Sequence, residues 1–576
     1  MITKTFARFI VVLLICISTA GAVENLDRGV VALPMDEGKV YIGWRLLKDD
    51  PTDVAFNVYR SAKPTDEYQM ISPLPINTST NFVDKTATAG KTYFYRIAPV
   101  IGGKEGPASK PSHVVAAAVK REYVSLKLLG KADFLKCAIA DLDGDGAYDY
   151  IIKQPGDNID PHEKNWKRSK GAYQLEAYRS DGTFLWRHDM GWAIEAGTWY
   201  SPYVAFDCDG DGRAEVYTKY GEGDPRGPDG RVTTGPEFLA RLNGMTGAVE
   251  KKTPWLSRNG YFFLFKYNLM SRNLLGIAYL DGKTPSIIMQ RGTYHLIKIA
   301  AYDADLNRKW YWNSNMEIHL RWFHGQGSHG MIAADVDGDS RDEIVYGAAV
   351  LDDNGKGLWS LGKGHPDVCY CGDIDPARPG FEIFYGFETS KWKNGVCLAD
   401  AKNGKILWGW DKPTKHVHEQ GMCADILADR PGLECYAGEK DRSRHWLYDA
   451  KGNLISSAPI NGLAPRAIRW DADPQQEVIL KGDVLAEGMD REKTKVLSKI
   501  VGRPVLIADC LGDWREEVIT SAKGELRIYS TTIPADSRRP CLMQDRLYRG
   551  YVANSSMGYW YPPLLGESSV SDAGGN

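Results

Sequence analysis

Three short acidic segments have the residue types and spacing of a cation-binding loop. Each places carboxylates at positions 1, 3, 5 and 9, with glycine at position 4 and, in two of the three, at position 6. Glycine lets the backbone curl so that the carboxylates converge, and such dense hard oxygen donors suit Ca²⁺ better than zinc or copper. A solvated acidic turn without an ion is the alternative. The predicted ligands are Asp141, Asp143, Asp145, Asp149, Asp207, Asp209, Asp211, Glu215, Asp335, Asp337, Asp339 and Glu343.

Weaker copies of the motif recur along the chain. They contain fewer carboxylates, so they indicate calcium less strongly than the three full copies do. We expect most such ions to pin the structure at a distance from any chemistry. The weaker candidate ligands are Asp373, Asp375, Glu382, Asp425 and Glu434; further copies start at Asp471 and Asp509, and a degenerate one contains Asp281.

Two histidines precede acidic loops. His329 ends the segment Gly325-Gln-Gly-Ser-His, just before the Asp335 loop, and His365 belongs to Gly364-His-Pro-Asp367, just before the Asp373 loop. Imidazole is an unusual partner for a hard cation. From spacing alone, these side chains can be metal ligands, bases or ordinary packing residues.

The acidic loops must be positioned by strands. Each full copy is followed by a short apolar strand, and several copies are trailed by a turn and a Leu-Trp-like segment, as in Tyr178–Trp186 and Ala399–Trp408. Two hairpins per repeat make a four-stranded unit. About eight units, roughly 40–70 residues apart, are typical of a β-propeller. We therefore predict an all-β chain with an eight-bladed β-propeller over residues 121–576.

The chain before this region has a different pattern. Residues 1–22 contain Lys4, Arg8, an apolar run and small residues near Ala22, which predict a secretory signal peptide. Residues 23–120 carry no acidic repeat and contain short candidate strands separated by turns. They predict an N-terminal β-sheet domain that resembles a fibronectin-III-like sandwich. The product is expected to be secreted or periplasmic.

Composition and net charge disfavour nucleic-acid and membrane partners. The chain has 576 residues, of which 25% are charged and 43% hydrophobic, and a formal net charge of −3. That balance is typical of a globular protein and disfavours a nucleic-acid binder, whose affinity depends on clustered Lys and Arg. No apolar run is long enough for a membrane helix. We expect a monomer without a nucleic-acid or membrane partner.

These motifs, taken together, resemble polysaccharide lyase family 11, the rhamnogalacturonan lyases. The likeness begins with Glu24-Asn-Leu-Asp-Arg-Gly-Val-Val-Ala-Leu33, continues through Gly235-Pro-Glu-Phe238 and the Asp335 loop, and ends with Leu526–Pro534. It covers nearly the whole chain after residue 22. The resemblance implies an eight-bladed propeller that cleaves the rhamnose–galacturonate backbone of pectin by β-elimination. It also implies that His329, His365 and Asp367 sit around calcium close to the Asp335 loop, and that Asn158 contacts sugar.

The sequence departs from the family around the cleft. An Arg of the family aligns with Gln420, and Ser498-Lys-Ile-Val501 replaces an Asn-Gly-Thr-Lys segment, so Lys499 or Arg503 substitutes only if the loop shifts. Tyr559 keeps the family's residue but loses polar neighbours. His418, in Lys415-His-Val-His-Glu419, offers a replacement base, although an exposed loop residue is the plainer interpretation.

The leading hypothesis is a calcium-dependent secreted lyase acting on rhamnogalacturonan I-type pectic polysaccharide. Its proton-transfer and charge-stabilising groups would be Tyr559, Lys499 and His418, and its substrate-binding residues Asn158, Arg503 and Gln420. A glycoside hydrolase acting through two carboxylates on an acidic rhamnose-containing glycan is one alternative. A non-catalytic glycan-binding propeller is the other.

Overall fold

The structure is a computed structural model that describes residues 24–261, 266–316, 320–388, 391–458, 465–486, 494–559 and 561–566, apart from the side chains of residues 320, 321, 419 and 420. The predicted signal peptide lies outside the described residues. The described chain is built almost entirely of antiparallel strands, so the all-β prediction is confirmed.

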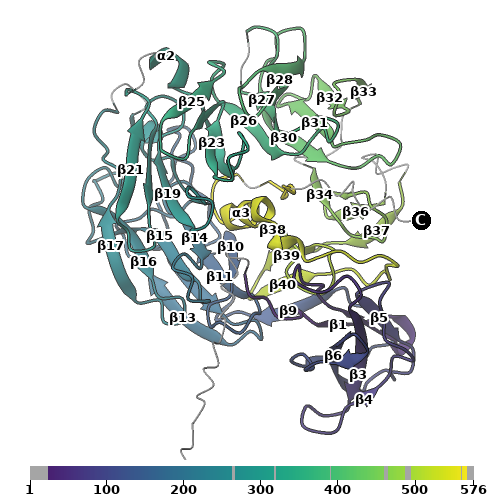
Figure 1. The fold of residues 1–576 in the computed structure, drawn as a ribbon. Helices are drawn as coiled ribbons and strands as arrows, with labels where there is room; N and C mark the ends of the chain where they lie inside the picture. Colours follow the sequence, from purple (N-terminus) through teal and green to yellow (C-terminus); the bar gives the residue numbers. More distant parts are fainter. Residues whose placement is uncertain are drawn as a thin grey trace, which may run out of the picture.

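Two small sheets make up the N-terminal part, drawn in purple in Figure 1. They share one hydrophobic core, which contains Ile42 from one sheet and Phe56, Val58 and Ile97 from the other. The first sheet contains β1 (Val31–Pro34), β2 (Val40–Gly43) and β5 (Asn81–Asp84). The second contains β3 (Ala55–Ser61), β4 (Gln69–Met70), β6 (Thr92–Ile101), β7 (Lys104–Glu105) and β8 (Ser112–Val115).

Eight four-stranded antiparallel sheets follow in the described residues, one for each copy of the acidic motif. In every sheet the motif joins the first strand to the second. The first four sheets are β10 (Lys136–Ala140), β11 (Asp149–Gln154), β12 (Gln174–Tyr178) and β13 (Phe184–Asp189); β14 (Tyr203–Phe206), β15 (Glu215–Gly221), β16 (Glu237–Leu242) and β17 (Val249–Pro254); β18 (Asn273–Ala278), β19 (Ser286–Arg291), β20 (Lys298–Tyr302) and β21 (Arg308–Asn313); and β22 (Gly327–Ala334), β23 (Glu343–Gly347), β24 (Ala349–Leu351) and β25 (Gly357–Ser360).

The last four sheets repeat this order, except that the eighth takes its outer strand from the N-terminal end of the region. That strand is β9, whose Leu126 pairs with Leu526 of β40. The four are β26 (Pro366–Gly372), β27 (Glu382–Phe387), β28 (Val396–Asp400) and β29 (Ile406–Gly409); β30 (Val417–Ala424), β31 (Glu434–Glu439), β32 (His445–Tyr448) and β33 (Leu454–Ser456); β34 (Arg466–Ile468), β35 (Glu477–Leu480), β36 (Asp483–Leu485) and β37 (Val496–Lys499); and β38 (Arg503–Ala508), β39 (Glu517–Ala522), β40 (Glu525–Tyr529) and β9 (Tyr123–Lys127).

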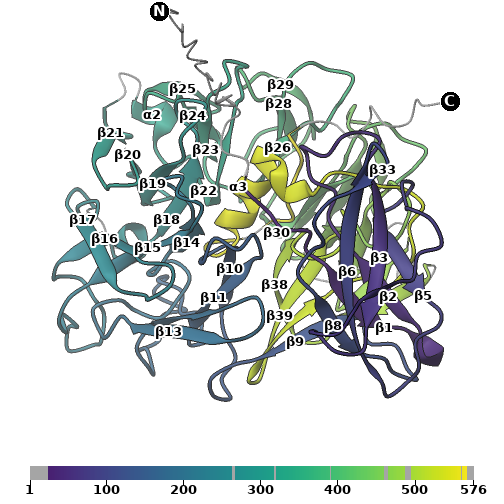
Figure 2. The ribbon, with the colours of Figure 1, turned by 60° about the horizontal axis from the view of Figure 1, so that its bottom comes forward.

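The first strands of the sheets pack side by side. Contacts run in order from β10 to β34, and β10 also contacts β38. Ile468 of β34 and Ile507 of β38 belong to one hydrophobic cluster. Figures 1 and 2 show the sheets arranged around a central helix, α3 (Arg546–Asn554).

Helix α3 was not identified from the sequence. It begins after Asp545, whose side chain accepts a hydrogen bond from the backbone N–H of Tyr548, as an N-cap does. Its buried side chains include Leu547, Tyr551 and Val552, and it contacts β10, β14, β18, β22 and β38.

The other described helical elements are short. They are α1 (Lys266–Met270), α2 (Leu320–Phe323), and the single 3₁₀ turns η1 (Asp36–Gly38) and η2 (Leu542–Gln544). In the part of the chain that the structure describes, no helix is both long enough and apolar enough to cross a membrane.

The acidic loops require left-handed backbone at their sixth position. Gly146 has φ +86°, and Ser340, at the same position of the Asp335 loop, has φ +73°. This conformation turns the Ser340 N–H toward the first carboxylate of its loop, 2.8 Å from Asp335 Oδ2. Glycine adopts it without strain, whereas serine does so less readily.

A buried ionic network joins the N-terminal sheets to the eighth sheet. Tyr41 of β2 donates a hydrogen bond to Asp513 at 2.8 Å, and Arg515 contacts the same carboxylate at 2.7 Å. All three side chains are almost fully buried. The Asp513 carboxylate therefore depends on Arg515 for its compensating charge.

We expect Arg515→Met to destabilise the protein by about 3–5 kcal/mol, because it leaves the Asp513 carboxylate buried and uncompensated. Calorimetric melting measures the effect as a fall in the transition midpoint. The control is Arg341→Met, which removes a half-exposed partner of Asp353 and should leave the midpoint unchanged. Equal shifts in the two variants would contradict the assignment.

Candidate active site and metal centre

The candidate residues lie at the two ends of the first strand of each four-stranded sheet, and so on two faces of the molecule. Acidic loops follow the ends of these strands, whereas the histidines stand at their beginnings. His329 is near the start of β22 and Asp335 follows its end, and the regularly paired residues Ile332–Ala334 alone put about 10 Å of extended strand between them. His329 and the Asp335 loop therefore lie at opposite ends of β22, and their closeness in the sequence does not by itself make them one site.

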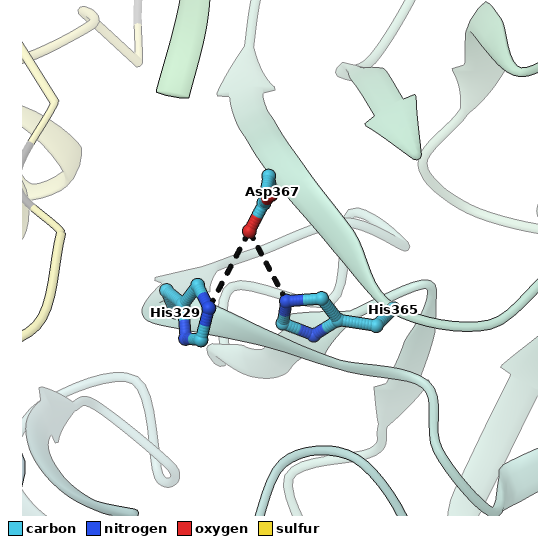
Figure 3. A group of neighbouring side chains, drawn as sticks. All are labelled: His329, His365 and Asp367. Carbon is cyan, nitrogen blue, oxygen red and sulfur yellow. Dashed lines mark hydrogen bonds and ion pairs between the residues drawn. The ribbon is translucent and has the colours of Figure 1, made fainter. Parts of the chain in front are cut away.

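Asp367 is the centre of the histidine cluster (Figure 3). Its Oδ1 atom lies 3.2 Å from His365 Nε2 and 3.4 Å from His329 Nε2. Its Oδ2 atom lies 3.4 Å from His416 Nε2 and 3.9 Å from His418 Nε2. Four imidazoles thus face one carboxylate whose side chain is only 1% exposed.

Local irregularities in three strands bring these side chains together. The pairing register shifts between Gly327 and Ile332 in β22, between Pro366 and Val368 in β26, and between Val417 and Gly421 in β30. Asp367 is the extra residue of its strand. Such a bulge redirects a side chain out of the ordinary alternation, which explains why residues from three separate sheets meet at one point.

Charge and hydrogen bonding define the protonation of the cluster. Burial acts to raise the pKa of Asp367, but its contacts with His365 and His416 outweigh this and hold the pKa well below its usual range. Burial, with His365 nearby, keeps the pKa of His329 well below its usual range. At neutral pH, Asp367 is therefore a carboxylate and His329 is uncharged.

The tautomer of His365 follows from its second contact. Its Nδ1 atom is hydrogen-bonded to the backbone carbonyl of Gly327, which can only accept, so Nδ1 carries a proton, and its Nε2 atom faces Asp367 Oδ1 at 3.2 Å. A lone pair facing a carboxylate is unfavourable unless a cation or a second proton lies between them. The donor set of His329, His365 and Asp367 fits a divalent cation in that position.

Aromatic rings enclose the cluster on its open side. The Tyr559 ring lies 4.5 Å from the His329 ring, and its backbone N–H donates to the His329 carbonyl at 2.9 Å. Trp199 lies 4.6 Å from His329 and 5.6 Å from Tyr559, centroid to centroid. The Tyr294 hydroxyl is 3.0 Å from His329 Nε2.

Arg272 adds a fixed positive charge to this wall. Its guanidinium lies 4.7 Å from the Trp199 ring centroid and forms a 2.9 Å ion pair with Asp160. Sequence reasoning missed Arg272, Tyr294 and Trp199. The one signal that finds them is the repeat itself, because they lie just before a first strand or just after a second strand, as the cluster residues do.

A basic group lies at the beginnings of β10, β34 and β38. Lys136 Nζ donates to the carbonyl of Gly558 at 3.1 Å, next to Tyr559, and Arg503 donates to the carbonyl of Phe134. Burial lowers the pKa of Lys136 to about 7, and Arg466 and Arg503 act in the same direction. The group can attract an anionic sugar.

The remaining predicted site residues occupy mixed positions. Asn158 is exposed, and its Oδ1 accepts a hydrogen bond from Thr198 N at 2.9 Å, beside Trp199. Lys499 is exposed in β37, three strands and roughly 14 Å outside the first strand of its sheet. The side chain of Gln420 lies outside the described residues.

The predicted calcium loops form a second set of candidate sites on the opposite face. The structure brings together Asp141, Asp143 and Asp149, then Asp207, Asp209 and Asp211, and then Asp335, Asp337 and Asp339, each group with ligand atoms within 4.8 Å of one another. Basic side chains contact all three loops: Lys110 pairs with Asp145 at 2.6 Å, Arg241 pairs with Asp209 at 2.7 Å and with Glu215 at 3.2 Å, and Arg341 lies 3.9 Å from Asp339.

Buried carboxylate oxygens in these loops fit bound cations. Glu343 Oε1 and Glu434 Oε1 have no hydrogen-bond partner among the described residues. Burial raises the pKa of each carboxyl to about 8, and the nearby Asp337 and Asp425, respectively, add to the rise. Burial also raises the pKa of Glu382, to about 7, and the nearby Asp373 adds to the rise. Glu382 Oε2 accepts hydrogen bonds from the backbone N–H groups of Ile374 and Asp375. A cation would remove the cost of ionising these groups.

Comparison with known proteins agrees with the geometry. Residues 131–568 match the family model described as rhamnogalacturonan lyase family 11, C-terminal domain, and residues 21–115 match that of the rhamnogalacturonan I lyases beta-sheet domain. The rhamnogalacturonan endolyase YesW of Bacillus subtilis is 36% identical over 94% of this chain and 90% of its own length. The exolyase YesX of the same organism is 35% identical over 94% of each chain.

Solved structures extend the likeness to the fold. The crystal structure of YesW superposes with a TM-score of 0.85 at 35% identity, covering 95% of this chain and 97% of that one. A family 11 rhamnogalacturonan lyase of Bacillus licheniformis gives the same TM-score at 34% identity and the same coverage. With both family models matched in order and relatives aligned over nearly their full length, the chain belongs to rhamnogalacturonan lyase family 11.

Proposed function

We propose that the protein cleaves the backbone of rhamnogalacturonan I-type pectin by β-elimination next to galacturonate. The observation that carries the proposal is the position of Tyr559 against His329, beside the buried Asp367 carboxylate and within a wall of aromatic and basic side chains. Family membership supports the substrate, because the relatives are named as rhamnogalacturonan lyases.

The eight four-stranded sheets are, in this proposal, the blades of one eight-bladed β-propeller over residues 121–576. The continuous packing of first strands around α3 supports it, as does the completion of the eighth sheet by β9. Residues 23–120 form a fibronectin-III-like domain, and residues 1–22 direct export to a secreted or periplasmic location. We propose that the enzyme acts as a monomer.

β-Elimination requires a weakly acidic proton to leave C5 of galacturonate while the bond at O4 breaks. The neighbouring carboxylate opposes this step until its charge is neutralised. His329, His365 and Asp367 would hold a divalent cation, which would supply that neutralisation when bound. Arg272 and Arg503 contribute fixed positive charge from the chain itself.

Each chain residue then has a distinct role. Tyr559 is the proposed proton-transfer group, because its ring lies 4.5 Å from that of His329: it takes the proton that leaves C5 and delivers a proton to the O4 leaving group. His418, 6.2 Å from the Tyr559 ring, is a second candidate for proton transfer. Arg503 and Asn158 bind the flanking sugars. Lys499 takes part only if β37 rearranges.

The acidic loops bind calcium as structural pins. Their distance from the histidine cluster, at the other ends of the first strands, supports a role in stability instead of chemistry. Among the full copies, the Asp335 loop has the loosest contact with a basic side chain, 3.9 Å between Arg341 and Asp339, whereas Lys110 and Arg241 approach the other two loops to 2.6 and 2.7 Å.

Incubation with rhamnogalacturonan I and Ca²⁺ should release products that carry the ultraviolet absorbance of an unsaturated uronate. The chromophore is specific to elimination, because hydrolysis leaves a saturated sugar. New reducing ends without absorbance identify a hydrolase. Retention of the polysaccharide without turnover identifies a non-catalytic binding protein; either result overturns the proposal.

We expect Tyr559→Phe to lower kcat by about 10²–10⁴-fold, the usual contribution of a proton-transfer group. The ring contacts with His329 and Trp199 are kept, so KM should change little. Steady-state assays of the chromophore measure both constants, with Tyr123→Phe in β9 as the control. An unchanged kcat in Tyr559→Phe would exclude the hydroxyl from proton transfer.

Calcium should raise the melting temperature, because an ion that binds only the folded state stabilises it by about 2.7 kcal/mol at 100 times its Kd. The double variant Asp335→Ala/Asp337→Ala should show a smaller difference between Ca²⁺ and EGTA than the wild type does. Asp305→Ala, an exposed carboxylate outside the loops, is the control. If EGTA leaves the wild-type melting temperature unchanged, the loops do not bind calcium.

A further inference from the structure

The Asp367 carboxylate has two coordinating sides. Oδ1 faces His329 and His365, whereas Oδ2 faces His416 and His418. The proposed function uses only the first side. The second pair comes from a different strand, with His416 just before β30 and His418 within it.

A second carboxylate stands on the His416 side. Glu388 Oε1, just after β27, lies 3.6 Å from His416 Nε2. The backbone N–H of Glu388 donates to the carbonyl of His365 at 3.1 Å, which fixes this segment against the first histidine pair. Two imidazoles and two carboxylates therefore converge from β26, the end of β27 and β30.

The separations match those between ligands of one metal ion. Ligands held about 2.0–2.1 Å from a cation in tetrahedral geometry lie roughly 3.3 Å from one another. His416 Nε2 is 3.4 Å from Asp367 Oδ2 and 3.6 Å from Glu388 Oε1, and His418 Nε2 is 3.9 Å from Asp367 Oδ2. The ligand atoms of Asp367, His416 and His418 all lie within 4.8 Å of one another.

The atoms at the centre of this group lack hydrogen bonds. Asp367 Oδ2 and His416 Nε2 are both buried and make no hydrogen bond with any described residue. The Asp367 side chain is 1% exposed. A buried carboxylate oxygen without a partner is costly, and a cation between Oδ2 and the imidazoles would satisfy both atoms.

We propose that Asp367 bridges two divalent cations, the second held by Asp367 Oδ2, His416, His418 and Glu388. The second ion is a zinc-like transition metal, because two imidazoles with carboxylates suit such an ion better than calcium. His416 and His418 remain 30% and 22% exposed, which leaves the ion a path from solvent. In this arrangement His418 is a metal ligand and not a base.

Only the catalytic role of the second ion rests on the proposed function. A second ion beside Tyr559 places another positive charge where the uronate must be neutralised. Metal binding itself is independent of the reaction and is measured without substrate.

Zinc stoichiometry tests the proposal on the full chain. The protein is equilibrated with excess Ca²⁺ to saturate the acidic loops, then with Zn²⁺, which displaces calcium from the His329, His365 and Asp367 site because imidazole ligands favour zinc. It is then separated by gel filtration and analysed by inductively coupled plasma mass spectrometry. We expect two Zn²⁺ per wild-type chain and one in His416→Ala/His418→Ala. The control is His188→Ala, a half-buried histidine of β13 outside the cluster, which should retain two.

The matched double variant His329→Ala/His365→Ala should also retain one ion, at the second site. Equal zinc content in the wild type and in His416→Ala/His418→Ala overturns the proposal, as does a single wild-type ion. Circular dichroism verifies that each variant is folded. Where a variant is unfolded, anomalous diffraction from Zn²⁺-soaked wild-type crystals decides: two peaks about 3.5–4 Å apart beside Asp367 support the bridge, and one peak excludes it.

The two proposals fail in separable ways. Two bound zinc ions without release of the uronate chromophore leave the metal centre in place and overturn the lyase. Chromophore release by a protein that binds one zinc ion leaves the lyase in place and overturns the second site.

Discussion

A carboxylate removed from water requires a positive charge close to it, and this constraint organises both faces of the molecule. On one face, Glu343 and Glu434 each have a buried carboxylate oxygen without a hydrogen-bond partner among the described residues. On the other, Asp367 lies among four imidazoles. Arg515 meets the same need for Asp513 between the two sets of sheets. At Asp513 the arginine of the chain supplies the compensating charge, and at the other buried carboxylates a bound metal ion could supply it.

Strand polarity separates stability from chemistry. Because every acidic motif follows the first strand of its sheet, all the loops gather on one face. Residues at the beginnings of the same strands gather on the other, and bulges in β22, β26 and β30 aim them at a common point. A substitution in a loop is therefore separated from the candidate site by the length of a buried strand.

The sequence predicts the repeating framework better than it predicts the site. The acidic spacing identifies all eight sheets because each loop is a local feature, fixed by residues within nine positions of one another. The site depends on residues from several sheets. His329, His365 and Asp367 could be named only through family resemblance, and Lys499, named in the same way, lies in an outer strand. Helix α3 was missed because its burial depends on five first strands that no local pattern reveals.

The pairing of β9 with β40 also bears on how the chain folds. These strands are separated by nearly 400 residues, and their contact is among the most distant in the sequence. The eighth sheet cannot be completed until almost the entire chain has been synthesised, because its outer strand is made first and its inner three last. Contacts of such long range fold slowly. The N-terminal sheets, whose strands pair only with one another, can form well before β9 meets β40.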